Sequence, residues 1–124
     1  MGLRILVVDA QPQVREMFQS ALGGRGHRVL CAPDGQQALF LAHQGAFQLV
    51  VVDPQLDNGD GMAILAELKR LQPAASCIVI TSHPGLMGGA LSLGVGLCLA
   101  KPIGERELLD LVEMVEGAPE PDPA

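Results

Sequence analysis

Four residues with ionisable or hydroxyl side chains stand at the ends of apolar segments of the sequence: Asp9, Asp53, Thr81 and Lys101. Two carboxylates held close together repel each other, and a hard divalent cation relieves that repulsion. An amine can pair with an anion, and a hydroxyl can donate a hydrogen bond to it. Together these groups suit a site for a divalent metal and a phosphoryl group, although each acid taken singly is also typical of a helix cap or a turn.

The segments that precede these residues have the pattern of buried strands. Residues 49–52 are continuously apolar, which is typical of a strand in a parallel sheet covered by helices. Strands are predicted over residues 4–8, 28–32, 49–52, 77–81 and 96–100. Helices are predicted from Pro12 to Gly23-Gly24, from Asp34 to Gly45, from Met62 to near Pro73, from Pro84 to Leu93 and from Glu105 to Val115.

This alternation of strands and helices predicts an α/β fold, with a parallel sheet and helices on both faces. The working site of such a sheet lies beyond the carboxyl ends of its strands, which is where the four residues stand. With 124 residues the chain fits one domain. We expect that domain over residues 1–116, and a disordered tail or the start of a linker over residues 117–124.

Composition excludes several classes of function. The net charge of −6 argues against nucleic-acid binding by this domain, because phosphate contacts need clustered Lys and Arg. No apolar stretch is long enough to span a membrane and no signal peptide is visible, so we expect a cytoplasmic protein without membrane contact. The dispersed cysteines are expected to be reduced core thiols and lack the paired spacing of a zinc site; they are Cys31, Cys77 and Cys98.

From about Arg4 to Val115 the sequence resembles the receiver domain of bacterial two-component response regulators. The resemblance is carried by short motifs at the strand ends and by the spacing between them. These motifs are Ile5-Leu6-Val7-Val8-Asp9, Leu49-Val50-Val51-Val52-Asp53, the Asp60-Gly61 pair that follows Asp53 by seven residues, Ile78-Val79-Ile80-Thr81-Ser82 and Leu99-Ala100-Lys101-Pro102.

The resemblance implies a flavodoxin-like, doubly wound, five-stranded parallel sheet with strand order 2-1-3-4-5. It also implies that Asp53 accepts a phosphoryl group from a histidine kinase, with Mg²⁺ bridging. Thr81 would bind the phosphoryl group and Lys101 would pair with it. The metal would be held by Asp9, Asp53 and the backbone of Gln55.

The sequence departs from the family pattern at this site. Ala10 stands where the family has the acid that touches the metal directly, and Mg²⁺ binding is therefore expected to be weak. Pro54 removes a backbone N–H donor directly after the acceptor. Cys98 replaces the aromatic residue that the family uses as a switch. Asp57 could replace the missing acid, but the loop around it is more simply a solvated turn.

A long uncharged stretch is the second unusual feature, because no Asp, Glu, Lys or Arg occurs between Leu71 and Ala100. The helix predicted from Pro84 to Leu93 should have a solvated face but has no charge to place on it. Exposed apolar patches usually mark contact sites. We therefore predict a partner or self-association surface over residues 84–98 that includes Leu86, Met87, Leu91, Leu93 and Cys98; the alternative is a loosely ordered segment that collapses locally.

The leading hypothesis is a receiver module of a two-component system, not an enzyme, that acts mainly through protein contacts with impaired Mg²⁺-dependent phosphorylation. Its partners would be a histidine kinase or another signalling protein, or a second copy of itself. The alternative is a conventional receiver phosphorylated on Asp53. A nucleotide- or flavin-binding protein of the same fold is disfavoured, because the acidic segment after the first strand would repel phosphate.

Overall fold

The protein is described by a computed structural model that covers residues 2–57 and 60–117. Strands and helices alternate along the chain, as the sequence pattern predicts. The strands are β1 (Arg4–Val8), β2 (Arg28–Ala32), β3 (Leu49–Val52), β4 (Ser76–Thr81) and β5 (Leu97–Ala100). The helices are α1 (Pro12–Gly23), α2 (Gly35–Ala42), α3 (Gly61–Leu71), the 3₁₀ turn η1 (Pro84–Leu86), α4 (Met87–Ser92) and α5 (Glu105–Glu116).

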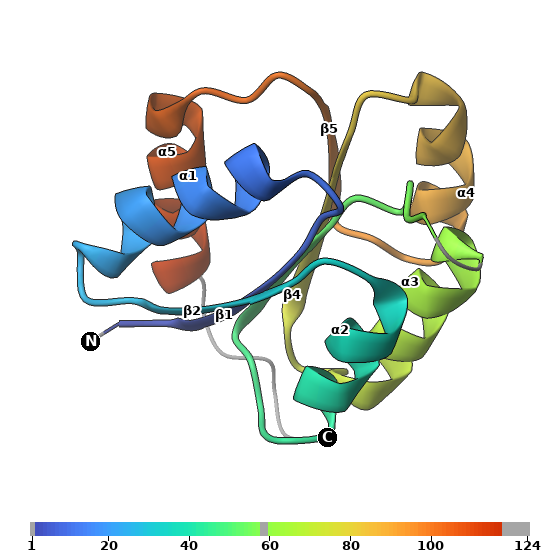
Figure 1. The fold of residues 1–124 in the computed structure, drawn as a ribbon, viewed down its shortest axis with the longest axis horizontal. Coiled ribbons are helices and arrows are strands. Elements are labelled where there is room, and N and C mark those ends of the chain that lie inside the picture. The colour runs from blue at the N-terminus through green and yellow to red at the C-terminus, as the bar shows by residue number, and fades with distance from the viewer. Residues whose placement is uncertain (1, 58–59, 118–124) are drawn as a thin grey trace.

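The strands form one parallel sheet in the order β2-β1-β3-β4-β5, which confirms the predicted flavodoxin-like topology. Helices α1 and α5 cover one face of the sheet, and α2, α3 and α4 cover the other (Figure 1). The last paired residues are Val8 and Val52 between β1 and β3, and Val52 and Val79 between β3 and β4. Residues that follow these strands are thereby brought to one edge of the sheet.

Alternate residues of the central strands supply two separate cores. On β1, Ile5 and Val7 pack with α1 and α5, whereas Leu6 and Val8 pack with α2 and α3. All four are at most 1% exposed, and full burial of each such side chain stabilises the fold by about 1.5–3 kcal/mol. The central strands are therefore held rigidly from both faces, and the residues at their carboxyl ends have little freedom to move.

Acidic residues begin two of the helices. The Asp34 carboxylate accepts a hydrogen bond of 2.8 Å from the Gln37 backbone N–H and caps α2. The Asp60 carboxylate accepts from the backbone N–H groups of Met62 and Ala63 at 3.0 and 3.3 Å, and caps α3. Asp60 of the Asp-Gly motif thus has a structural role at the start of a helix.

The segment from Pro84 to Leu93, predicted as one helix, contains a 3₁₀ turn, η1, followed by the short helix α4. Gly88 and Gly89 lie within α4, where glycine is the least favourable residue apart from proline. Ala90 is fully buried and anchors this helix on the sheet. The exposed Ser92 hydroxyl donates to the Gly88 carbonyl oxygen of its own helix at 3.0 Å.

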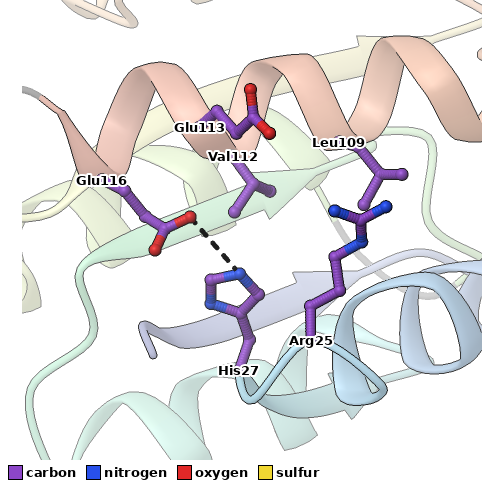
Figure 2. A pocket seen from close by; sticks show the side chains of 6 residues that line it. All are labelled: Arg25, His27, Leu109, Val112, Glu113 and Glu116. Atoms are coloured by element: carbon purple, nitrogen blue, oxygen red, sulfur yellow. Dashed lines mark ion pairs between the residues drawn. The ribbon is translucent and has the colours of Figure 1, made fainter. Parts of the chain in front are cut away.

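At the opposite end of the sheet from the strand-terminal acids, His27 lies between α5 and the start of β1. Its Nδ1 atom accepts a hydrogen bond of 2.9 Å from the Leu3 backbone N–H, and its Nε2 atom lies 3.6 Å from a Glu116 carboxylate oxygen (Figure 2). A cavity of about 280 Å³ beside it is lined by Arg25, His27, Leu109, Val112, Glu113 and Glu116. His27 precedes β2, so it is remote from the acidic edge, as its position in the sequence indicates.

Within the described residues, none of the helices has the length and apolarity that crossing a bilayer requires.

Candidate functional site

Asp9 and Asp53 lie next to each other at the carboxyl edge of the sheet. Asp53 continues β3 alongside β1, with its backbone N–H donating to the Val8 carbonyl at 2.8 Å. Each aspartate residue is only 4% exposed. Two neighbouring carboxylates at this depth need hydrogen-bond donors and a compensating positive charge.

A backbone N–H two residues further along fixes one oxygen of each carboxylate. Asp9 Oδ1 accepts from the Gln11 N–H, and Asp53 Oδ1 accepts from the Gln55 N–H, both at 2.9 Å. These are local aspartate turns that the chain makes directly after a strand. They set the plane of both carboxylates and leave the two Oδ2 atoms directed at a common neighbour.

That neighbour is the ammonium group of Lys101, which reaches the site from the end of β5. Its Nζ atom lies 2.8 Å from Asp9 Oδ2 and 2.8 Å from Asp53 Oδ2, and its side chain is 8% exposed. It also donates a hydrogen bond of 2.8 Å to the Gln11 side-chain Oε1. Two carboxylates and one ammonium leave this cluster with a charge of −1, and Lys101 is the cation that holds them together.

These contacts shift the ionisation of both partners. Burial is the main cause that raises the pKa of Asp9, and the neighbouring Asp53 charge adds to it, while hydrogen bonds from Lys101 and Gln11 oppose the shift. Burial by itself would lower the pKa of Lys101, but its hydrogen bonds to Asp53 and Asp9 outweigh that effect and raise it. Lys101 is therefore firmly charged at neutral pH.

Thr81 reaches the same edge from β4 and is fully buried. Its hydroxyl oxygen accepts a hydrogen bond of 3.2 Å from the His83 backbone N–H, and its carbonyl accepts one of 3.0 Å from the Lys101 N–H. The structure thus brings Asp9, Asp53, Thr81 and Lys101 to one edge, as their positions after the strands predict.

Other residues considered from the sequence lie around this cluster. Ala10 is half-buried and offers only a methyl group. Asp57 is exposed, which agrees with its expected place in a solvated turn, and His83 is exposed as well. Cys98 is partly buried, with its Sγ atom 3.9 Å from the Met87 carbonyl oxygen.

The surroundings of the three cysteines disfavour the thiolate form. Burial raises the pKa of the Cys77 thiol to about 11, and burial also raises the pKa of Cys31 and Cys98. A thiol with a raised pKa has little thiolate at neutral pH and is a poor nucleophile. Cys77 is buried, and Cys31 and Cys98 are half-buried and pack against the two cores, in agreement with the expectation of reduced core thiols.

The carboxylate oxygens that a Mg²⁺ ion would contact at this edge are engaged by another group of the protein. Mg²⁺ requires octahedral oxygen ligands and is usually bound through carboxylates and waters. Here the facing oxygens of Asp9 and Asp53 are both engaged by the Lys101 ammonium. Within residues 2–57 and 60–117, no three acidic, His or Cys side chains gather closely enough to hold a metal.

A parallel sheet of this order, with acids, a hydroxyl and a lysine at its carboxyl edge, defines a flavodoxin-like α/β domain with an ion-pair site. Residues 5–113 match the family described as "Response regulator receiver domain". The chain belongs to this family, and it is therefore a signalling module of the kind found in two-component systems.

Individual relatives agree with this assignment. The chain is 35% identical to the transcriptional regulatory protein AruR of Pseudomonas aeruginosa over 113 residues, covering 86% of this chain and 46% of AruR. It is 28% identical to the transcriptional regulatory protein GlrR of Escherichia coli, covering 95% of this chain and 28% of GlrR. The chain thus spans less than half the length of these curated relatives.

Solved structures support the fold. NtrX of Brucella abortus matches at 30% identity with a TM-score of 0.81, covering 93% of this chain and 27% of NtrX. The chemotaxis response regulator CheY4 of Vibrio cholerae matches at 21% identity with a TM-score of 0.83, covering 93% of this chain and 99% of CheY4. At that identity the likeness to CheY4 shows the shared fold only.

Proposed function

We propose that this receiver domain signals mainly through protein contacts and that its Mg²⁺-dependent phosphorylation is impaired. The observation that carries the proposal is the composition of the acidic edge. Ala10 supplies no carboxylate, and Lys101 bridges Asp9 and Asp53. One of the two negative charges that a metal ion would balance is already balanced by a side chain of the protein itself.

Transfer of a phosphoryl group to Asp53 would develop negative charge beside Asp9. Donors and cations placed where such charge develops are usually the largest contribution to catalysis. Lys101 is the cation at this point, whereas Pro54 has no backbone N–H to contribute. The residues present therefore favour slow transfer.

If Asp53 is phosphorylated at all, the geometry supports the roles that the family resemblance implies. Asp53 would be the acceptor, and Lys101 would pair with the added phosphoryl group. Thr81 would bind the phosphoryl group after its hydroxyl turns toward Asp53. Asp9, Asp53 and the backbone of Gln55 would be the remaining ligands of a weakly bound Mg²⁺.

A small phosphodonor tests the proposal directly. When the protein is incubated with acetyl phosphate and Mg²⁺, we expect slow, substoichiometric addition of a phosphoryl group, measured by intact-protein mass spectrometry. Asp53→Asn is the control, because it removes the acceptor oxygen while keeping the shape of the side chain. Rapid stoichiometric labelling that is lost in Asp53→Asn would overturn the proposal and establish a conventional phosphoacceptor.

The surface proposed for contacts is the uncharged α4 region, together with β5. Leu91 and Leu93 are 56% and 36% exposed, while Leu86, Met87 and Cys98 are partly buried beside them. Apolar side chains that face solvent with no charge among them favour association. A second copy of the domain or another signalling protein, such as a histidine kinase, would cover this surface; the net charge of −6 disfavours nucleic acid.

Self-association through α4 is a separate expected result. We expect the wild-type chain to show a concentration-dependent monomer–dimer equilibrium in sedimentation velocity experiments, and Leu91→Lys with Leu93→Lys to shift it to monomer. Phe40→Lys is the matched control, because Phe40 is 64% exposed but lies on α2. A dimer that persists in the double variant would exclude α4 as the contact surface.

A further inference from the structure

The side chain of Gln11 makes a contact at the acidic edge that the proposed function does not require. Its Oε1 atom accepts a hydrogen bond of 2.8 Å from Lys101 Nζ, over a separation of 90 residues in the chain. An ammonium group has three hydrogens to donate. With Asp9 Oδ2 and Asp53 Oδ2, the Gln11 oxygen makes three acceptors at the same distance of 2.8 Å.

These three acceptors come from two segments of the fold. Asp9 and Gln11 lie in the connection between β1 and α1, and Asp53 directly follows β3. The ammonium is therefore held on three sides, and its hydrogen-bonding capacity is filled. A lysine side chain held only by two ion pairs would retain one free donor, which would turn to water.

The backbone of Gln11 is fixed before its side chain meets Lys101. Its N–H donates to Asp9 Oδ1 at 2.9 Å, and its carbonyl accepts from the Val14 and Arg15 N–H groups at 3.2 and 3.3 Å. Pro12 restricts the next residue of the chain. Only the side-chain torsions of Gln11 remain to be ordered, which reduces the entropic cost of the contact with Lys101.

We propose that Gln11 is a positioning residue. Its side chain supplies the third acceptor of the Lys101 ammonium and so keeps this cation between the two aspartates. Gln11 and Lys101 both line a cavity of about 410 Å³ with Gln13, Val14, Met17, Ser82, Pro102 and Ile103. This role goes beyond the proposed function, because it concerns the unphosphorylated protein and does not depend on how readily Asp53 accepts a phosphoryl group.

The lysine content of the chain makes the proposal directly measurable. The sequence contains only Lys69 and Lys101, so a spectrum of the full chain labelled with ¹⁵N-lysine has at most two side-chain signals. Lys69 Nζ donates one hydrogen bond of 3.1 Å to the Gly94 carbonyl at an exposed position, and its ammonium hydrogens should exchange rapidly with water. Lys101, which is buried and triply bonded, should give a protected ¹H–¹⁵N signal.

Two substitutions of Gln11 distinguish the effect of its acceptor oxygen from the effect of its side-chain size. In Gln11→Met, which has a similar length but no oxygen, the exchange of the Lys101 ammonium hydrogens should accelerate about tenfold. Gln11→Glu keeps an Oε acceptor and should preserve the protection. Acylation of the lysines, followed by mass spectrometry, should modify Lys101 faster in Gln11→Met than in the wild type and Gln11→Glu. Lys69 should be labelled equally in all three proteins.

The backbone amide spectrum reports whether each variant is folded, and Gln11→Asn, with its acceptor drawn back by one methylene, is a second loss variant. The proposal is overturned if folded wild-type protein shows no protected Lys101 signal, or if exchange in the Met and Asn variants equals that of the wild type. The assay contains no metal and no phosphodonor. Its failure is therefore distinct from failure of the proposed function.

Discussion

Replacing Ala10 by aspartate is expected to raise the affinity for Mg²⁺ by about tenfold or more and to accelerate phosphorylation by acetyl phosphate about a hundredfold. Ala10 directly follows Asp9 and is half-buried at the same edge of the sheet. A carboxylate at this position would add a third acid to a cluster that has a charge of −1. The variant would then favour a divalent cation over the single positive charge of Lys101.

The same substitution is expected to destabilise the metal-free protein, and this can be measured without any phosphodonor. In the absence of metal, three carboxylates would share one ammonium, which should lower the free energy of unfolding by about 1 kcal/mol. Because a ligand that binds only the folded state stabilises it, Mg²⁺ should raise the Tm of Ala10→Asp clearly and that of the wild type little. Far-UV circular dichroism follows the transition, since the chain has no Trp or Tyr.

Ala10→Asn is the matched control, because it adds a side chain of the same size without the charge. It should bind Mg²⁺ no better than the wild type and should leave the labelling rate low. Equal gains in the Asp and Asn variants would show that charge at position 10 is not the cause. Equal Mg²⁺ affinity in the wild type and Ala10→Asp would contradict the inference that the absence of a carboxylate at position 10 weakens metal binding.

Much of the fold can be predicted from the sequence because strand ends and buried periodicity are local signals. The continuous apolar run of β3 and the motif residues after each strand place Asp9, Asp53, Thr81 and Lys101 at one edge, and the structure confirms this placement. The roles of these residues in phosphorylation stay predictions. The start of β4 at Ser76 and of β5 at Leu97 differ by one residue from expectation, since pairing with the neighbouring strand decides such boundaries.

Contacts between distant polar side chains could not be predicted in the same way. Gln11 has no neighbour in the sequence that signals an ammonium group 90 residues away. Gln72 is similar: its buried side chain accepts from the Phe47 N–H and donates to the Ala42 and Gly45 carbonyls, which fixes the α2–β3 loop. Glutamine occurs widely on surfaces, so its residue type alone carries no signal of either role.

The other large expected effect concerns Gly61, the second residue of the Asp-Gly motif. A Cβ atom added at this position would lie 1.5 Å from the Pro54 carbonyl oxygen and 2.5 Å from its carbonyl carbon. Both atoms belong to backbone, so a rotamer change cannot relieve the clash. We expect Gly61→Ala to lower the free energy of unfolding by about 3 kcal/mol, measured by urea unfolding followed by circular dichroism.

Gly88→Ala is the control for this prediction, because a Cβ there meets nothing within 4 Å and the residue lies inside α4. That substitution should raise the free energy of unfolding by about 0.5–1 kcal/mol. Loss of less than about 1 kcal/mol in Gly61→Ala would show that the loop moves aside easily.

The clash at Gly61 also bears on the acidic edge. Pro54 directly follows Asp53, and its displacement would disturb the turn in which the Gln55 N–H donates to Asp53 Oδ1. Whatever Gly61→Ala molecules remain folded should therefore lose the protection of the Lys101 ammonium, which depends on Asp53 being held in place. The Asp-Gly motif is thus explained by packing: Asp60 caps α3, and Gly61 lets that helix begin against the backbone that carries the central aspartate.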